Sequence, residues 1–258
     1  MSRVLALVSM ALLLAACGGG GGALSLDPVA SAAAKTAKQG SVKVDFAMVG
    51  GGVQGTGSGL FDNDGSAGRL SMDLHAKGKS IHMDAVMQGL VMYMRSPVFH
   101  SDPSFPKGKD WIKIDLEKAL KAQGIDLESL QNMSPQSSLS FLRGSTGTPE
   151  KVGTEAVRGV KTTHYHATID LQAAADKANG SAAKTLHKLV ELTGQKTMSV
   201  EAWVDGKGLV RKESYSQRFA PGQPAVTVTM VLYGFGPAVS IKTPPSDKVF
   251  DVTKLAGQ

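Results

Sequence analysis

The sequence predicts an α+β fold organised around one antiparallel β-sheet. Apolar residues recur at every second position in several segments. Short turn sequences containing Gly, Asp or Lys join these segments, and Ala- and Leu-rich helical segments interrupt the alternation. Because strands joined by short turns pair antiparallel, we expect the first half of the chain to form a meander of at least five strands.

The first strands show the alternation most clearly. In residues 42–48 the even positions are apolar, while Lys43 and Asp45 face the other way. In residues 54–60, three glycines share one face and leave it without side chains, which permits sharp curvature or the close approach of another group. These glycines are Gly55, Gly57 and Gly59, and the alternation returns in residues 70–74, 81–87 and 90–95.

Helical segments are predicted at three places. Residues 23–39 are Ala-rich and suit a short helix with Pro28 in its first turn. Asp115 can cap a helix over residues 116–123, and Ser134-Pro135 is typical of the start of a second helix through Leu142. The spacing of apolar residues indicates further helix within residues 173–192. The helices within residues 116–142 follow a strand at residues 111–115 and separate the meander from the later strands.

The second half of the chain returns to strands. In residues 150–171 one face carries Tyr165 and Ile169, and the opposite face carries His164 and His166. Residues 198–219 read as a hairpin that turns at Asp205-Gly206-Lys207-Gly208. Two further strands are expected, over residues 226–232 and, as the last strand of the chain, residues 239–242.

The N-terminal segment is predicted to be a lipoprotein signal peptide. Arg3 and the apolar run 4–14 match a secretory leader, and this run is too short to span a bilayer. Leu14-Ala15-Ala16-Cys17 resembles a bacterial lipobox, whose cysteine receives a diacylglyceryl group. The glycines at 18–22 suit a flexible tether and disfavour the alternative, a buried cysteine behind an uncleaved segment. We therefore expect a signal peptide at 1–16, lipidated Cys17 and a tether at 17–33, and one domain at 34–258, anchored at the extracytoplasmic face of the cell membrane.

Composition limits the fold and its partners. Cys17 is the only cysteine in 258 residues, so no disulfide can form within the chain. The formal net charge of +6 is spread along the sequence, and a mild excess of this kind favours proximity to anionic lipid headgroups. No basic run resembles a nucleic-acid-binding arm, so we expect no nucleic-acid partner.

Five segments carry a family resemblance, namely Val91–Met94, Trp111–Asp115, Val152–Tyr165, Ala202–Lys212 and Tyr233–Gly236. Together they resemble the actinobacterial envelope lipoproteins of the LppX/LprG type, within the LolA/LolB-like superfamily. The resemblance covers residues 34–253 and implies a strongly curved antiparallel half-barrel whose concave face is covered by helices. It also implies an apolar cavity between sheet and helices that binds acyl chains of lipids or glycolipids for carriage within the cell envelope. Some relatives sense or regulate instead, which leaves open a regulatory or scaffold role with an envelope protein partner.

The methionines support such a cavity independently. Six of the eleven fall in strands around the glycine-rich strand, and methionine side chains suit surfaces that accommodate variable apolar ligands, although each one alone is more typical of a core filler. The candidate cavity residues are Phe46, Met48, Leu70, Met72, Leu74, Met83, Met87, Met92, Leu139, Leu142, Tyr165, Ile169, Leu189, Val228 and Met230.

Other motifs do not add a catalytic or metal site. His164 and His166 share one strand face, but the sequence shows no third ligand, so we predict no metal. Residues 50–55 fit G-x-G-x-x-G, yet they lead into a strand, whereas a dinucleotide site needs a helix N-terminus. The S-x-x-K matches at Ser104 and Ser181 lack the other motifs of serine acyl enzymes. We therefore predict neither an enzyme nor a cofactor.

Overall fold

The computed structural model describes residues 28–62, 67–76, 78–121, 149–177, 183, 187, 190–218 and 222–253. Several predicted features lie outside these residues, namely the leader, Cys17, the helix over 134–142 and most of the helical section 178–189. Among the candidate cavity residues, Leu139, Leu142 and Leu189 also lie outside them.

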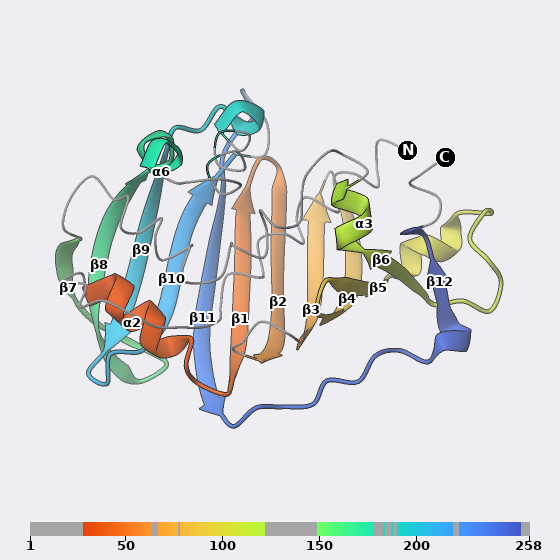
Figure 1. Cartoon of the computed structure of the whole chain (residues 1–258), viewed down its shortest axis with the longest axis horizontal. Helices are drawn as coiled ribbons and strands as arrows, with labels where there is room; N and C mark the ends of the chain where they lie inside the picture. The colour runs from red at the N-terminus through yellow and green to blue at the C-terminus, as the bar shows by residue number, and fades with distance from the viewer. Residues whose placement is uncertain are drawn as a thin grey trace.

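The described strands form one open, curved sheet of twelve strands (Figure 1). Their order across the sheet is β12-β6-β5-β4-β3-β2-β1-β11-β10-β9-β8-β7. All neighbouring pairs are antiparallel except β12 with β6. The predicted fold class and the meander are confirmed. The bounds are β1 Ser41–Gly50, β2 Val53–Asp62, β3 Ala67–Ala76, β4 Lys79–Gln88, β5 Val91–Arg95, β6 Trp111–Asp115, β7 Glu150–Val157, β8 Val160–Asp170, β9 Thr197–Asp205, β10 Val210–Gln217, β11 Val226–Gly236 and β12 Val249–Asp251.

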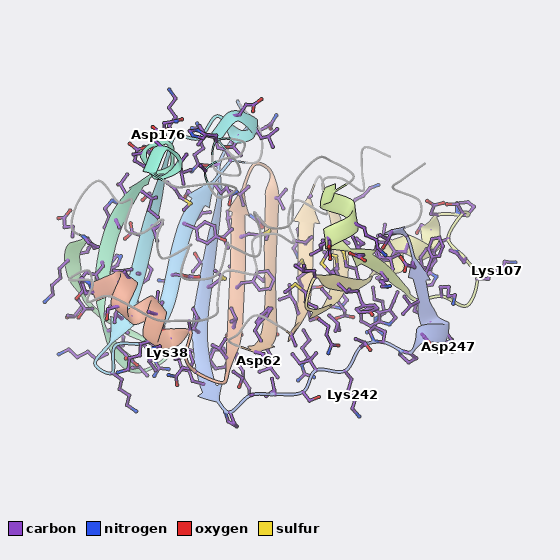
Figure 2. The ribbon with its side chains drawn as sticks, viewed as in Figure 1. Lys38, Asp62, Lys107, Asp176, Lys242 and Asp247 are labelled. Carbon is purple, nitrogen blue, oxygen red and sulfur yellow. The ribbon has the colours of Figure 1, made fainter. Side chains whose placement is uncertain are left out.

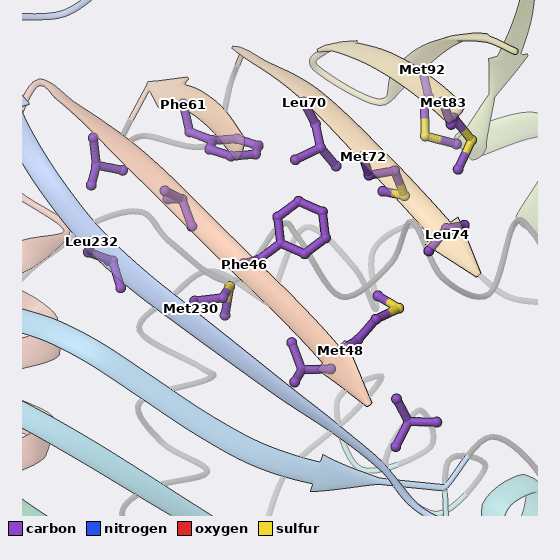
Figure 3. Close-up of a cluster of buried hydrophobic side chains, with 14 of the residues drawn as sticks. Phe46, Met48, Phe61, Leu70, Met72, Leu74, Met83, Met92, Met230 and Leu232 are labelled. Atoms are coloured by element: carbon purple, nitrogen blue, oxygen red, sulfur yellow. The ribbon is translucent and has the colours of Figure 1, made fainter. Parts of the chain in front are cut away.

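The alternation in the sequence becomes two faces of the sheet. On β1 the side chains of Val42, Val44, Phe46 and Met48 are buried, and Lys43 is exposed. We call the face that carries these four residues the inner face. Apolar residues of β1–β6, β10 and β11 form one core cluster on it, together with residues of two helices (Figure 3). Burial of this apolar area is the main stabilising contribution to the fold.

The glycine-rich strand β2 is covered by side chains of the protein itself. A Cβ added at Gly57 would lie 2.4 Å from Phe46 Cε1 and 2.3 Å from the carbonyl oxygen of Ser71. At Gly59 it would lie 2.6 Å from Phe61 Cε2. Glycine therefore leaves room on the inner face for two phenylalanine rings from neighbouring positions.

Three described α-helices accompany the sheet. They are α2 Pro28–Thr36, α3 Leu116–Lys121 and α6 Leu171–Lys177, and two 3-10 helices, η1 Pro97–Ser101 and η2 Ser246–Lys248, lie in the connections. The backbone N–H of Lys118 donates to Asp115 Oδ1 at 3.1 Å, which confirms the predicted cap of α3. The N–H of Ala173 donates to Asp170 Oδ1 in the same way at the start of α6.

Helix α2 packs against β9 and β10. Its first residues belong to the segment that we expected to be a flexible tether. Val29, Ala30 and Ala32 are buried, and the N–H of Val210 donates to Thr36 Oγ1 at 2.8 Å. The expected tether, residues 17–33, overlaps this packed helix from Pro28 onwards. We therefore shorten the proposed tether to residues 17–27.

The expected last strand at residues 239–242 is wrong. Residues 238–245 form no strand and run along the lower edge of the molecule to its other end, with Lys242 projecting outward (Figures 1 and 2). Pro244 and Pro245 lack the N–H groups that a sheet ladder needs. The last strand is β12, which pairs in parallel with β6.

Within the described residues, no helix has the length and apolar character needed to cross a membrane.

Candidate ligand-binding face

One register row crosses the inner face from β8 to β4. Each residue in it pairs laterally with the next, in the order Tyr165, Ala202, Glu213, Met230, Phe46, Gly57, Met72 and Met83. Since side chains on one face of neighbouring strands stand beside each other, the sheet brings five of the candidate cavity residues into one line. These five are Tyr165, Met230, Phe46, Met72 and Met83.

The β11-to-β4 part of this row is densely packed. Phe46, Met72, Met83 and Met230 expose 5–6% of their surface. The candidates Met48, Leu70, Leu74, Met92 and Val228 belong to the same cluster, and Met87 packs against it (Figure 3). In this part of the inner face the candidates contact one another.

The β8-to-β10 part is more open. Ile169 is buried in a separate small cluster with Leu171 and Val190, against which Met198 and Val200 pack. Tyr165, Met198, Val200 and Tyr215 remain partly exposed on the inner face. These four side chains form a strip on β8–β10 that retains accessible surface, in which Met198 and Val200 pack against the small cluster and Tyr215 packs against the large one.

Glu213 lies in this strip, and it was not among the residues selected from the sequence. Its neighbours in the chain point to the outer face, because Lys212 Nζ lies 3.8 Å from the centre of the Trp203 ring and the Ser214 hydroxyl hydrogen-bonds the Thr229 hydroxyl at 3.0 Å. Alternation along β10 therefore places Glu213 on the inner face, between Ala202 and Met230.

The Glu213 carboxyl has an unusual environment for an acid. Among the described residues none forms a hydrogen bond or an ion pair with it. Burial in these apolar surroundings raises the pKa of Glu213 to about 7. Little in the sequence points to this site, because residues 210–217 are mostly polar and only the pairing of β10 with β9 and β11 shows which of them face inward.

A hollow of about 470 Å³ lies elsewhere, at the turns that join β1 to β2 and β3 to β4. Its lining includes Val49, Gln54, His75 and Lys79. None of the described candidate cavity residues lines it. The hollow is open and bordered by hairpin turns, so it is distinct from the inner face.

The two histidines on β8 are joined through a carboxylate on the outer face. His164 Nε2 lies 2.7 Å from Glu201 Oε2, and His166 Nδ1 lies 2.6 Å from Glu201 Oε1. Trp203 stacks on His164 with ring centres 4.1 Å apart and donates its indole N–H to the Glu155 carboxylate. The sequence did not show that Glu201 lies beside both histidines. Within the described residues, no group of three His, Cys, Asp or Glu is placed to hold a metal ion.

The turn between β7 and β8 is fastened across the outer face. Arg158, with φ of 48°, directs Nη1 to Asp45 Oδ2 at 2.8 Å, and its guanidinium lies 3.9 Å from the centre of the Tyr233 ring. The Tyr233 hydroxyl donates to Asp45 Oδ1 at 2.9 Å, and this hydrogen bond, with burial, raises the pKa of Tyr233. These contacts link the β7–β8 hairpin to β11 and β1, several strands away in the sheet order, and so support the curvature.

No protein-family profile matches the chain. The chain is 30% identical over 158 residues to an uncharacterized 31.2 kDa protein from the rplA-rplJ intergenic region of Streptomyces griseus, an alignment that covers 58% of this chain. It spans 51% of that relative, about half of its length.

Two solved structures of mycobacterial lipoproteins are similar to the chain. Lipoprotein LppX from Mycobacterium tuberculosis is 13% identical, with a TM-score of 0.50 over 83% of this chain and 96% of LppX. LprF from Mycobacterium bovis is 14% identical, with a TM-score of 0.49 over 84% of this chain and 95% of LprF. The likeness to LppX concerns the fold. The chain therefore has an LppX-type fold, as expected from its sequence.

Proposed function

We propose that this protein is a lipid-anchored lipoprotein of the cell envelope that binds acyl chains of lipids or glycolipids on its inner face and carries them, without enzymatic activity. The observation that carries the proposal is the continuous inner-face row, apolar for most of its length and partly exposed on β8–β10. A half-exposed apolar face gains stability when an alkyl chain covers it, at about 25 cal/mol per Å² of apolar area removed from water.

The chemistry of the face suits alkyl chains. The methionines of the core cluster are flexible and can adapt to different chain shapes. The described inner face contains few groups that could act on a substrate, and Glu213 has no base, nucleophile or cation beside it in the register row. Binding without chemical conversion is therefore the activity that this arrangement supports.

The proposed anchor brings this face to a membrane. Acylation of Cys17 attaches the chain to the outer leaflet of the cell membrane, since two acyl chains anchor stably where one is marginal. Residues 17–27 would then allow the sheet to reach lipid at the membrane surface. A shared fold with LppX, which is described as a lipoprotein, supports this placement.

Uptake of a fluorescent phospholipid from vesicles tests the proposal. Val200→Lys places a charge on the partly exposed inner face and should reduce uptake at least tenfold, whereas Ser199→Lys, one residue away on the exposed outer face, should leave uptake unchanged. Equal uptake by both variants would place binding elsewhere. No uptake by the unmodified protein would reject the carrier function.

The alternative is a regulatory or scaffold lipoprotein of the same fold with a protein partner. The dense packing of the β11-to-β4 part of the row favours it, because these candidates fill the space between themselves. Under this alternative neither the unmodified protein nor the two lysine variants take up lipid.

A further inference from the structure

The strongest unexplained group in the described part of the chain is Glu213. A carboxyl on an apolar face loses hydration that only a hydrogen-bonding partner can replace. No described residue provides that partner. Unsatisfied polar groups of this kind are rare in folded proteins and are concentrated where a ligand completes the site.

The surroundings of Glu213 decide which ligand chemistry fits. Ala202 on β9 and Met230 on β11 are its lateral neighbours, and Tyr215 lies two positions along β10 on the same face. Tyr165 follows Ala202 in the row, and Lys151, which pairs with Tyr165, is the next residue in it. Lys151 is exposed and three strands away from Glu213, about 14 Å at the usual strand spacing.

Helix α2 adds no charge beside Glu213. It packs against β9 and β10 with Val29, Ala30, Ala32 and Thr36 buried. Its Lys35 is exposed, with its side chain at Gly208 in the β9–β10 turn. The described elements around Glu213 therefore place no cation close enough to neutralise an anionic carboxyl, or to bind an anionic lipid headgroup beside it.

A carboxyl that is neutral in a large share of molecules near pH 7 both donates and accepts hydrogen bonds. A hydroxyl group can likewise donate and accept hydrogen bonds, whereas an ester can only accept them. A carboxylate or phosphate would bring a negative charge next to the Glu213 carboxyl. The side chain between Glu213 and Tyr165 in the row is the methyl group of Ala202, which is buried, whereas Glu213 and Tyr165 each retain some accessible surface.

We propose that Glu213 binds an uncharged hydroxyl group of a lipid whose alkyl chain lies along the inner face, and that it selects against lipids with an anionic group at this position. This inference rests on the proposed lipid-binding function and specifies its substrate class. Tyr165 borders the same position from the far side of Ala202. Because the bound chain covers the remaining exposed surface of Glu213, binding favours the protonated carboxyl, and affinity falls as the pH rises above 7.

A matched set of probes tests the inference on the full chain with Cys17→Ala. The four probes carry the same pyrene-labelled sixteen-carbon chain and end in a hydroxyl, an acetate ester, a carboxylate or an amine. Fluorescence titration at pH 6.5 should show the alcohol binding about three- to tenfold more tightly than the ester, the range expected for one net hydrogen bond, and the carboxylate binding most weakly.

Two variants locate this preference. Glu213→Leu should bind the alcohol and the ester equally while still binding both chains, and Glu213→Gln should keep the alcohol preference but lose its weakening between pH 6.5 and 8.5. Glu150→Gln, an exposed carboxyl on edge strand β7, is the control and should behave as the unmodified protein. An alcohol preference that survives in Glu213→Leu, or tightest binding of the amine, would overturn the inference. If no probe binds any of these proteins, the proposed function itself fails.

Discussion

Glu213 shows how one residue can set a pH dependence for the whole fold. Its neighbours on the inner face are apolar, and burial raises its pKa to about 7. In the unfolded chain a glutamate ionises near pH 4.3. Between these two values the unfolded chain releases a proton that the folded chain keeps, so the free energy of unfolding decreases as the pH rises from about 4.3 to 7.

Replacement of Glu213 by Gln should remove this decrease in the free energy of unfolding with rising pH. At pH 4 the carboxyl is protonated in both states, so the two proteins should differ only by a constant offset. By pH 8 the unfolding free energy of Glu213→Gln should have gained on the order of 3–4 kcal/mol relative to the unmodified protein, since the folded and unfolded pKa values differ by about 2.7 units and one unit corresponds to about 1.4 kcal/mol. Urea unfolding at both pH values measures it, and a difference that does not vary with pH would contradict a raised pKa.

Gly57 occupies a position on β2 where a larger side chain does not fit. A Cβ there would meet the Phe46 ring and also the carbonyl oxygen of Ser71, which cannot rotate away. We expect Gly57→Ala to lower the free energy of unfolding by about 1–3 kcal/mol through overpacking. Gly153→Ala is the matched strand control, because no atom lies within 4 Å of its added Cβ. Equal stability of the two variants in thermal unfolding would show that the β2 face is not tightly covered.

The sequence predicted features that depend on local patterns, and it did not predict the surroundings of Glu213. Regular alternation in residues 42–48 and the three glycines of β2 are local patterns, and they predicted the buried face of β1 and the bare face of β2. Glu213 acquires its environment from Ala202 and Met230, which reach it only through sheet pairing. Local periodicity carries no information on that pairing.

At the scale of elements, β12 is held to β6 by a small set of polar contacts. Lys113 Nζ lies 2.9 Å from Asp251 Oδ2, and the N–H of Thr253 donates to Asp251 Oδ1 at 3.0 Å. Burial opposes ionisation of Asp251, but hydrogen bonds from Thr253 and Lys113 outweigh it and lower its pKa to about 2. The stabilisation from this carboxylate is therefore present above about pH 4 and is lost as the pH falls towards 2.

Asp251→Asn should loosen β12 without unfolding the sheet. The pair is partly exposed to solvent, so we expect a loss of no more than about 1 kcal/mol. Hydrogen exchange of the amides at 249–251 should accelerate about fivefold at pH 7 and much less at pH 2.5. Asp247→Asn, an exposed position in η2, is the control. Unchanged exchange in Asp251→Asn would show that the backbone ladder alone holds β12.

This edge is also where the prediction of elements was wrong. Residues 239–242 have the composition of a strand, but no neighbouring strand pairs with them among the described residues. The chain runs below the sheet from β11, inside the sheet, to β12 at one edge (Figure 1). Elements with strong internal signals, such as α2, β1 to β6 and the hairpin of β9 and β10, were predicted correctly. The helix over residues 134–142 stays a prediction.

At the scale of the whole molecule, β1 joins the two halves of the sheet. It pairs with β2 on one side and with β11 on the other, across more than 180 positions of sequence. This pairing places Met230 beside Phe46 and extends the inner face from the meander to β8. The closure depends on long-range contacts, so the sequence predicted the fold through family resemblance rather than through local pattern.

The proposed lipid anchor at Cys17 can be tested independently of the inner face. If Cys17 carries the lipid, Cys17→Ala should move the protein from the membrane fraction to the soluble fraction in a host that processes lipoproteins. Ser2→Ala, within the proposed signal peptide, is the matched control and should remain at the membrane. Retention of Cys17→Ala at the membrane would refute the lipobox interpretation but would leave the proposed binding face untouched.

Native mass spectrometry of the Cys17→Ala protein, purified from bacteria without detergent, tests most directly whether the inner face binds lipid. We expect a population heavier by the mass of one lipid, which gentle activation releases as the free lipid and which reforms after incubation with vesicles. A single unbound mass before and after incubation with lipid would contradict it.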